Sequence, residues 1–124
     1  MNLGDQAPHF SLKGVDGQNH ALKDFSDAKA LIVIFSCNHC PYVKAYEERM
    51  IAIQRDYQAQ GVRLAVINSN DPVGYPEDAF DKMVARARER GYNFPYLCDD
   101  TQQVARAYGA THTPPLFVFN TQRR

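Results

Sequence analysis

Two mostly apolar segments of the chain are short, and the first of them is continuous, rich in β-branched residues and bounded by turn-forming sequence. "ALIVIF" covers residues 30–35, and "VRLAVIN" covers residues 62–68. Runs of this length and composition predict strands that are buried on both faces of a sheet. Two later segments predict further strands: "FPYLC" at 94–98 is a short strand, and "THTPPLFVF" at 111–119 is a loop that leads into a strand.

Helical periodicity begins directly after the first of these runs, at Pro41, and ends at Gly61. Apolar residues recur there at steps of three or four, which predicts a helix with one apolar face. These apolar positions are Val43, Tyr46, Met50, Ile53 and Tyr57. A much shorter helix is predicted from Thr101 to Tyr108, where Gly109 stops it.

Another helix is predicted after the loop "SNDPVGYP", residues 69–76. Pro76 suits the first helical position, and Glu77 and Asp78 suit the positive start of a helix. The helix then continues to about Gly91. Its inward-facing residues are predicted to be Phe80, Met83, Val84 and Ala87.

The amino-terminal residues 8–22 predict a β-hairpin, because alternating residues flank the turn signal Asp16-Gly17. The whole order is then a hairpin followed by β-α-β-α-β-α-β. Strands that alternate with helices predict an α/β fold, with a mainly parallel sheet and helices on both faces. A length of 124 residues suits one domain, which we expect to span 1–124.

Charge and composition exclude several classes of function. Fourteen basic and fourteen acidic residues leave no net charge, so neither nucleic acid nor an anionic membrane surface is an expected partner. No apolar run reaches membrane-spanning length, and the amino terminus has no signal-peptide pattern. We therefore expect a cytoplasmic protein. Three cysteines in a reducing compartment indicate catalytic, metal-binding or inert thiols rather than a disulfide framework.

Two of these cysteines, Cys37 and Cys40, lie between the first central strand and the helix that begins at Pro41. A thiol at a helix amino terminus faces unpaired backbone N–H groups and the positive end of the dipole, which lower its pKa below ~8.5. Cys40 is nearest the helix start, so we predict that it is the nucleophile. Cys37 is near enough for a disulfide if the loop geometry permits. His39 between them either stabilises the thiolate or is a solvated loop residue.

Other interpretations of the same residues stay open. A free cysteine often acts only as a small buried hydrophobe. A zinc site would draw its ligands from Cys37, Cys40, Cys98, His39 and His112. However, the sequence has no second Cys-x-x-Cys and no His-x-x-x-His pair to complete such a site. Cys98 is better explained as a structural thiol than as a resolving cysteine. His112 reaches the same cleft if its loop packs there, whereas His9 and His20 are typical surface residues.

Several segments together resemble the thioredoxin-like superfamily, in its redoxin or AhpC/TSA branch with the peroxiredoxin-like "thioredoxin family protein" members. "GDQAPHFSLKGVDGQNHALKDF" resembles the amino-terminal hairpin extension of that branch, and "IVIFSCNHCPYVKAYE" resembles its active-site strand and helix. "VINSND", "FPYLCDDTQQVARAYGA" and "THTPPLFVFN" resemble the succeeding elements in order. The resemblance covers nearly the whole chain, and it is specific because the motifs occur together.

The resemblance implies a thioredoxin-like fold and roles for particular residues. Thr113-Pro114 matches the Thr-Pro step whose proline is cis in this fold, and whose loop docks the substrate chain against the thiol. In thioredoxins the first reactive cysteine lies five residues after the strand phenylalanine. Counting from Phe35 in the same way reaches Cys40, in agreement with the argument from the helix dipole.

The sequence departs from the family pattern at several positions. Val43 occupies the position of thioredoxin's second cysteine, so the visible pair Cys37 and Cys40 is out of the usual register. His112 occupies a position where related sequences often have cysteine. The peroxiredoxin signature Pro-x-x-x-Thr-x-x-Cys is absent, although Ser36 lies near its threonine position. These departures weigh against a standard dithiol cycle and against peroxide reduction through that threonine.

Relative to the family, the chain ends at "NTQRR", before a last strand and helix that we expect of the complete fold. The last strand would then be an unprotected edge, and an apolar face would lack its covering helix. A homodimer or a strand exchange would protect both.

The sequence therefore predicts a thiol-dependent oxidoreductase without a cofactor. Cys40 attacks a disulfide sulfur or a peroxide oxygen, and Cys37 resolves the product. An external thiol electron donor, thioredoxin or a low-molecular-weight thiol, restores the dithiol. His39 and the backbone amides near Pro41 to Val43 stabilise the thiolate, and Pro114 shapes the substrate groove. Disulfide reductase and peroxidase are not separable here, and the alternative is a non-catalytic thioredoxin-like binding module.

Overall fold

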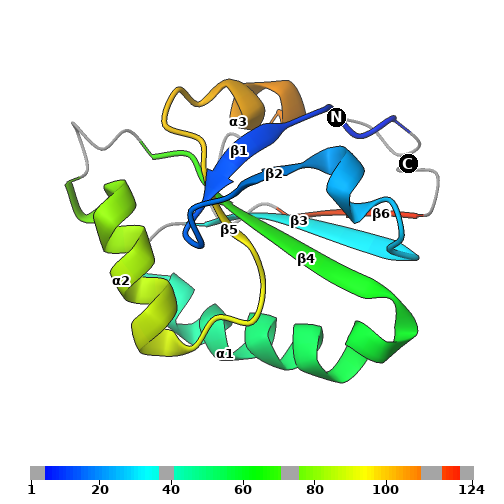
Figure 1. The fold of residues 1–124 in the computed structure, drawn as a ribbon, viewed down its shortest axis with the longest axis horizontal. Coiled ribbons are helices and arrows are strands. Elements are labelled where there is room, and N and C mark those ends of the chain that lie inside the picture. The colour runs from blue at the N-terminus through cyan, green and yellow to red at the C-terminus, as the bar shows by residue number, and fades with distance from the viewer. Residues whose placement is uncertain (1–4, 37–40, 71–75, 110–115, 121–124) are drawn as a thin grey trace.

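In a computed structural model, the described part of the chain is a six-stranded sheet with helices on both faces (Figure 1). The described residues are 5–36, 41–70, 76–109 and 116–120, without the side chains of residues 41–45, 77 and 116. The strands are β1 (Ser11–Gly14), β2 (Asn19–Ala21), β3 (Ala30–Ser36), β4 (Val62–Asn68), β5 (Tyr96–Cys98) and β6 (Leu116–Phe119). The α-helices are α1 (Pro41–Tyr57), α2 (Phe80–Arg90) and α3 (Gln103–Tyr108), and the 3₁₀-helices are η1 (Leu22–Phe25), η2 (Gln58–Gln60) and η3 (Pro76–Asp78).

The sheet is mixed, with the strand order β2-β1-β5-β4-β3-β6. β3, β4 and β5 are parallel, as expected for strands joined by helical crossovers. The prediction of a mainly parallel sheet holds for these central strands only. The amino-terminal hairpin joins β5 through the antiparallel strand β1, and β6 joins β3 antiparallel at the opposite side.

The two faces of the sheet have separate apolar cores, because alternate residues of each strand point to opposite sides. In β3, Val33 and Phe35 belong to the core under α3, whereas Ile34 belongs to the core under α1 and α2. Figure 1 shows α1 and α2 together on one side of the sheet and α3 on the other. The predicted buried strands at 30–35 and 62–68 are thereby confirmed.

The inward face of α1 differs from the predicted apolar stripe. Met50 is buried, but Tyr46 and Tyr57 are 42% and 47% exposed. The stripe instead includes the polar residues Glu47 and Gln54, which are 3% and 4% exposed. Polar side chains are stable there because each has partners in the neighbouring elements, which the periodicity of apolar residues does not reveal.

The start of α2 also differs from the prediction. Pro76–Asp78 forms the separate 3₁₀-helix η3, and α2 begins only at Phe80. Asp78 does not lie at an exposed helix start; it is 2% exposed and turns into the protein. The helix ends as predicted at Gly91, whose φ of 67° is the left-handed conformation that glycine adopts without strain.

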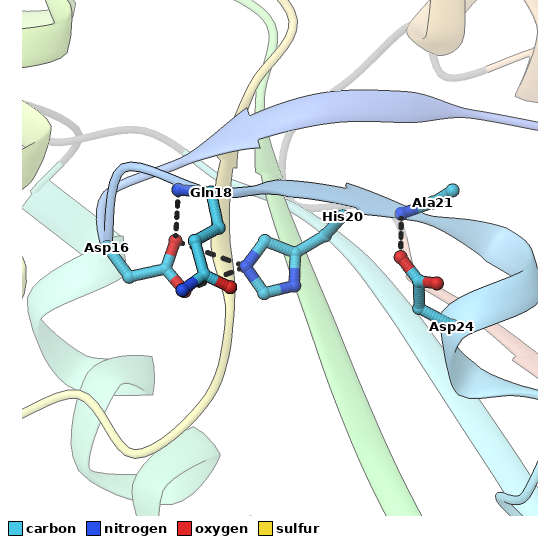
Figure 2. A network of polar contacts seen from close by, with 5 residues as sticks. All are labelled: Asp16, Gln18, His20, Ala21 and Asp24. Atoms are coloured by element: carbon cyan, nitrogen blue, oxygen red, sulfur yellow. Dashed lines mark hydrogen bonds and ion pairs between the residues drawn. The ribbon is translucent and has the colours of Figure 1, made fainter.

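The predicted hairpin is confirmed, and its turn contains a small polar network (Figure 2). His20 Nε2 lies 2.9 Å and 3.1 Å from the two carboxylate oxygens of Asp16. The same carboxylate accepts a hydrogen bond from the backbone N–H of Gln18 at 3.1 Å. The His20 side chain is therefore held against the hairpin turn by its contacts with Asp16. Within the described ranges, every helix is too short or too polar to cross a membrane.

Candidate functional site at the carboxyl edge of the sheet

The two cysteines of the Cys-x-x-Cys pair fall between two well-defined elements. Ser36 is the last residue of β3, a central strand, and Pro41 is the first residue of α1. The predicted helix start at Pro41 is confirmed. Cys37, His39 and Cys40 themselves lie outside the described residues. The flanking elements nevertheless define what this segment joins: the carboxyl end of a parallel strand and the amino terminus of a 17-residue helix.

The segment that contains Thr113 and Pro114, like His112, also lies outside the described residues, but its two flanks are described. It follows α3 and leads into β6, whose first residue pairs with Ile34 of β3. β6 therefore begins at the edge of the sheet where β3 ends.

Aromatic contacts hold the same flanks together. The ring centroid of Phe35 is 6.0 Å from that of Phe117 in β6 and 5.6 Å from that of Tyr108 in α3. Tyr108 also packs against Phe119, with 6.0 Å between centroids. Edge-to-face contacts of this kind fix the relative placement of the elements that carry them. The end of β3, the end of α3 and the start of β6 therefore form one packed unit.

A row of three polar residues crosses the carboxyl ends of the parallel strands. Ser36 pairs with Asn68, and Asn68 pairs with Cys98. Strand alternation places all three on the face covered by α1 and α2, since Ile34, Val66 and Tyr96 belong to that core. Ser36 is 4% exposed and Asn68 is 1% exposed.

Asn68 is the centre of a buried hydrogen-bond network. Its amide Nδ2 donates to Asp78 Oδ1 at 3.0 Å and to the Tyr96 hydroxyl at 3.1 Å. Its Oδ1 accepts the backbone N–H of Asn70 at 3.0 Å, and Asn70 Nδ2 donates to Asp78 Oδ2 at 2.9 Å. Both oxygens of the Asp78 carboxylate therefore accept hydrogen bonds from asparagine amides.

A second buried carboxylate, Asp99, lies at the same edge on the opposite face. It accepts hydrogen bonds from the backbone N–H groups of Val104 and Ala105, at 3.3 Å and 3.0 Å, in the first turn of α3. The hydroxyl of Ser69 also donates to Asp99, at 2.7 Å. Asp99 therefore supplies hydrogen-bond acceptors to backbone N–H groups at the start of α3, which have no partner within the helix.

Cys98 does not have the environment of an activated thiol. Burial raises the pKa of its thiol, and the charge of Asp100 raises that pKa further. Cys98 lies in an open groove of about 410 Å³, together with Lys13, whose Nζ is 4.5 Å from the ring centroid of Phe80. Cys98 is in β5, and β4 lies between β5 and β3. The backbone of Cys98 is therefore roughly 9–10 Å from that of Ser36, at two strand spacings. The structural interpretation of Cys98 fits these facts better than the resolving one.

Glu47 forms a second polar cluster, between α1 and α2. Arg86 Nε donates to Glu47 Oε1 at 2.7 Å, and Arg86 Nη2 lies 2.6 Å from the same oxygen without being aligned for a hydrogen bond. The Tyr92 hydroxyl donates to the same oxygen at 2.9 Å, and Arg90 Nε lies 3.5 Å from Glu47 Oε2. Burial, and then the contact with Glu47, raise the pKa of Tyr92.

Sequence reasoning missed both polar networks. Asp78 and Glu47 were not predicted to be buried, Asn68 was predicted only as the last residue of a buried strand, and the hydrogen bonds of these side chains were not predicted. The polar run "NSND" directly after an apolar strand was the available signal for Asn68 and Asn70. For Glu47 no signal was available, because its partners lie about forty residues away. The described residues contain no group of three or more His, Cys, Asp or Glu side chains that could hold a metal ion. Of the five suggested zinc ligands, only Cys98 is among the described residues, so the zinc hypothesis is not tested.

Comparison with known proteins places the chain in a family. Residues 3–124 match the model of the AhpC/TSA family. The chain is 29% identical over 120 residues to the thiol-disulfide oxidoreductase ResA of Geobacillus thermodenitrificans, an alignment covering 95% of this chain and 63% of that protein. It is 24% identical over 110 residues to a candidate peroxiredoxin of Mycobacterium tuberculosis, covering 89% of this chain and 65% of that protein. The chain thus spans less than two thirds of the length of these curated relatives.

Solved structures agree with the fold. An uncharacterized conserved protein from Geobacillus kaustophilus is 44% identical, with a TM-score of 0.96 over 99% of this chain and 66% of that chain. The thioredoxin domain of a thiol-disulfide oxidoreductase from Bacteroides vulgatus has a TM-score of 0.84 at 13% identity, over 100% of this chain and 85% of that chain. The second likeness shows the fold alone, and it confirms the predicted thioredoxin-like fold.

Proposed function

The chain belongs to the AhpC/TSA family, and we propose that it is a thiol-disulfide oxidoreductase with Cys40 as nucleophile and Cys37 as resolving thiol. The observation that carries this proposal is the position of residues 37–40 between the end of β3 at Ser36 and the start of α1 at Pro41. Unpaired N–H groups of the first turn of α1, together with the helix dipole, favour a thiolate at that position.

The reaction balances as two thiol-disulfide exchanges. The Cys40 thiolate attacks one sulfur of a substrate disulfide, the S–S bond breaks, and the released sulfur takes up a proton. Cys37 loses its proton and attacks Cys40 in the mixed disulfide. The second substrate thiol leaves, and a Cys37–Cys40 disulfide remains. The substrate has gained two electrons, which an external thiol donor returns to the protein.

The neighbouring residues have supporting roles in this proposal. His39 and the backbone amides that follow Pro41 stabilise the thiolate. Thr113 and Pro114 shape the groove in which a substrate chain docks, and the start of β6 beside the end of β3 supports this placement. A compartment that keeps thiols reduced, such as the cytoplasm, would supply the thiol donor.

Peroxide reduction is the second candidate. One curated relative is a candidate peroxiredoxin, and a Cys40 thiolate would attack a peroxide oxygen to give a sulfenic acid. The absence of the peroxiredoxin threonine signature before Cys40 makes this candidate the weaker one. A non-catalytic binding module has less support than either, because both curated relatives named above are described as redox proteins.

Mass spectrometry of the oxidised protein tests the proposal. The reduced protein is treated with one equivalent of oxidised glutathione or of hydrogen peroxide, and its peptides are mapped. We expect a loss of two hydrogens at Cys37–Cys40 and catalysed reduction of a disulfide substrate by dithiothreitol. Cys40→Ser abolishes turnover, Cys37→Ser accumulates the mixed disulfide, and the control Cys98→Ser retains turnover.

Two outcomes contradict the proposal. Oxygen added to Cys40 while Cys37 stays reduced, with turnover of peroxide and not of disulfides, identifies a peroxidase with one active cysteine. A Cys40 thiol that reacts no faster than an ordinary cysteine, without turnover of either substrate, identifies a binding module.

A further inference from the structure

The turn of the amino-terminal hairpin places a glycine directly after an aspartate. The backbone N–H of Gly17 donates to the carbonyl oxygen of Gly14 at 3.0 Å, and the N–H of Gly14 donates to the carbonyl oxygen of Gln18 at 2.8 Å. The loop therefore has three residues and ends in a left-handed one, since the φ of Gly17 is 85°. Glycine adopts that backbone without strain, so the turn itself favours glycine after Asp16.

Asp16-Gly17 is the only Asp-Gly dipeptide of the chain, and such dipeptides are prone to a spontaneous rearrangement. The backbone nitrogen of the glycine attacks the side-chain carboxyl carbon of the aspartate, and water leaves as a five-membered succinimide ring closes. Water then opens the ring at either carbonyl, which gives aspartate or isoaspartate. Among the described residues, apart from its chain neighbours, nothing lies within 4 Å of the position that a Cβ of Gly17 would occupy. Tight packing around this glycine is therefore not what protects the turn.

Polar contacts hold the carboxyl group of this reaction in place (Figure 2). His20 Nε2 lies 3.1 Å from Asp16 Oδ1 and 2.9 Å from Asp16 Oδ2, and the backbone N–H of Gln18 donates to Oδ1 at 3.1 Å. Burial would raise the pKa of Asp16, but the hydrogen bonds from Gln18 and His20 lower it. An ionised carboxylate is a much poorer electrophile than the neutral acid. Both the charge and the position of the Asp16 carboxyl group therefore oppose ring closure.

A second glycine makes room for these contacts. A Cβ on Gly14 would lie 2.7 Å from Asp16 Oδ1 and 2.8 Å from His20 Cδ2, which is closer than van der Waals contact allows. The carboxylate and the imidazole thus pack directly against the backbone of β1. Gly14 is buried and pairs with Leu97 of β5, so the backbone beneath the two side chains is itself held in the sheet.

We propose that Asp16-Gly17 is a site of spontaneous isoaspartate formation, and that His20 protects it by holding the Asp16 carboxylate away from the backbone nitrogen of Gly17. The reaction needs two movements: the Gly17 N–H must leave the carbonyl oxygen of Gly14, and the carboxyl group must leave His20. Isoaspartate adds one atom to the backbone of the turn. The hairpin would then lose the register that pairs Lys13 with Asn19. This protection does not depend on the redox function proposed above.

Ageing of the full chain at 37 °C and pH 7.4 tests the role of His20. Isoaspartate at position 16 is measured over time by electron-transfer fragmentation of peptides, in native buffer and in guanidinium chloride. We expect folded wild type to react at least roughly tenfold more slowly than the unfolded chain, because only the open turn reacts. His20→Ala should accelerate the reaction in native buffer about fivefold, as expected for the loss of one hydrogen bond. His9→Ala, at an exposed histidine outside the hairpin, leaves the rate unchanged.

Two further variants separate the contact from general stability, which urea denaturation measures for each. His20→Phe keeps an aromatic ring without a donor, and its rate should rise as in His20→Ala. His20→Gln keeps a side-chain N–H donor, and its rate should stay closer to that of wild type. A wild-type rate in folded His20→Phe overturns the proposal, and so does an equal acceleration in His9→Ala. Folded wild type that forms isoaspartate as fast as the unfolded chain overturns it as well.

Discussion

Glu47 of α1 and Arg86 of α2 form an ion pair with only 3% and 15% of their side chains exposed. Arg86 Nε donates to Glu47 Oε1 at 2.7 Å, and Tyr92 adds a hydrogen bond to the same oxygen. The contact with Glu47 raises the pKa of Arg86, although burial alone would lower it. The pair joins the two helices that cover one face of the sheet, so it fixes α1 in place above the core.

Replacement of Glu47 by glutamine tests the contribution of this pair to stability. Glu47→Gln leaves Arg86 as a nearly buried charge without its counter-charge, so we expect a loss of about 3 kcal/mol in the free energy of unfolding. Urea denaturation measures it. Glu48→Gln, at an exposed neighbouring position, changes the same free energy by less than about 0.5 kcal/mol. Equal effects of the two variants would contradict this account.

Gln54 holds α1 against β4 in a different way. Its side-chain amide donates to the carbonyl oxygen of Val62 at 3.0 Å and accepts the backbone N–H of Leu64 at 2.9 Å. Gln54→Leu leaves the buried N–H of Leu64 without this acceptor, and we expect a loss of about 2 kcal/mol in stability.

Hydrogen exchange reports on the Gln54 contact directly. The amide of Leu64 should exchange faster in Gln54→Leu by more than the overall loss of stability explains. Gln58→Leu is the matched control, since Gln58 lies one helical turn further on and is exposed. Unchanged protection of the Leu64 amide in Gln54→Leu would show that another group accepts its hydrogen bond.

Cys98 should react slowly with alkylating agents in the folded protein. Burial raises the pKa of its thiol, and the negative charge of Asp100 raises it further, so less thiolate is present at pH 8 than in an unfolded chain. We expect iodoacetamide to modify Cys98 faster in urea than in buffer, and faster in Asp100→Asn than in wild type. Asp81→Asn, exposed on α2, serves as the charge control. A native rate equal to that in urea would contradict the assigned environment.

The hairpin network in Figure 2 predicts a pH dependence with a definite sign. Burial would raise the pKa of Asp16, but the hydrogen bonds from the Gln18 amide and from His20 prevail and lower it. A carboxyl whose pKa is lower in the folded state stabilises the fold above its unfolded pKa of about 3.9, and this contribution disappears as the pH falls through the folded pKa.

Asp16→Asn should therefore be less stable than wild type at pH 7 and approach wild type in acid. Urea midpoints at pH 7, pH 4 and pH 2.5 measure this difference. Asp27→Asn, whose carboxylate lies 80% exposed elsewhere on the surface, is the control. A constant difference between Asp16→Asn and wild type at all three values would show that the Asp16 carboxyl is not linked to folding.

The sequence predicted the elements and the order in which they occur. Residues 30–35 and 62–68 were identifiable as buried strands because short, mostly apolar segments bounded by turn signals are typical of the central strands of an α/β sheet. Gly61 and Gly91 marked helix ends because their left-handed backbone is favourable mainly for glycine. The junction at Pro41 was identifiable for a similar local reason, since proline suits the first turn of a helix. Each of these inferences depends on residues that are close together in the chain.

Only the tertiary structure determined which polar residues are buried and with which partners. Glu47 and Asp78 are charged side chains that periodicity assigns to a surface or a helix start, yet both are buried. Both carboxylates are stable there because they accept hydrogen bonds: Glu47 from Arg86 and Tyr92, and Asp78 from Asn68. The partners are ten to forty-five residues apart in the chain. Pairing over such separations depends on how strands and helices pack together. The sequence by itself therefore determined where the strands and helices lie along the chain, and the fold determined which buried charges and polar groups pair with one another.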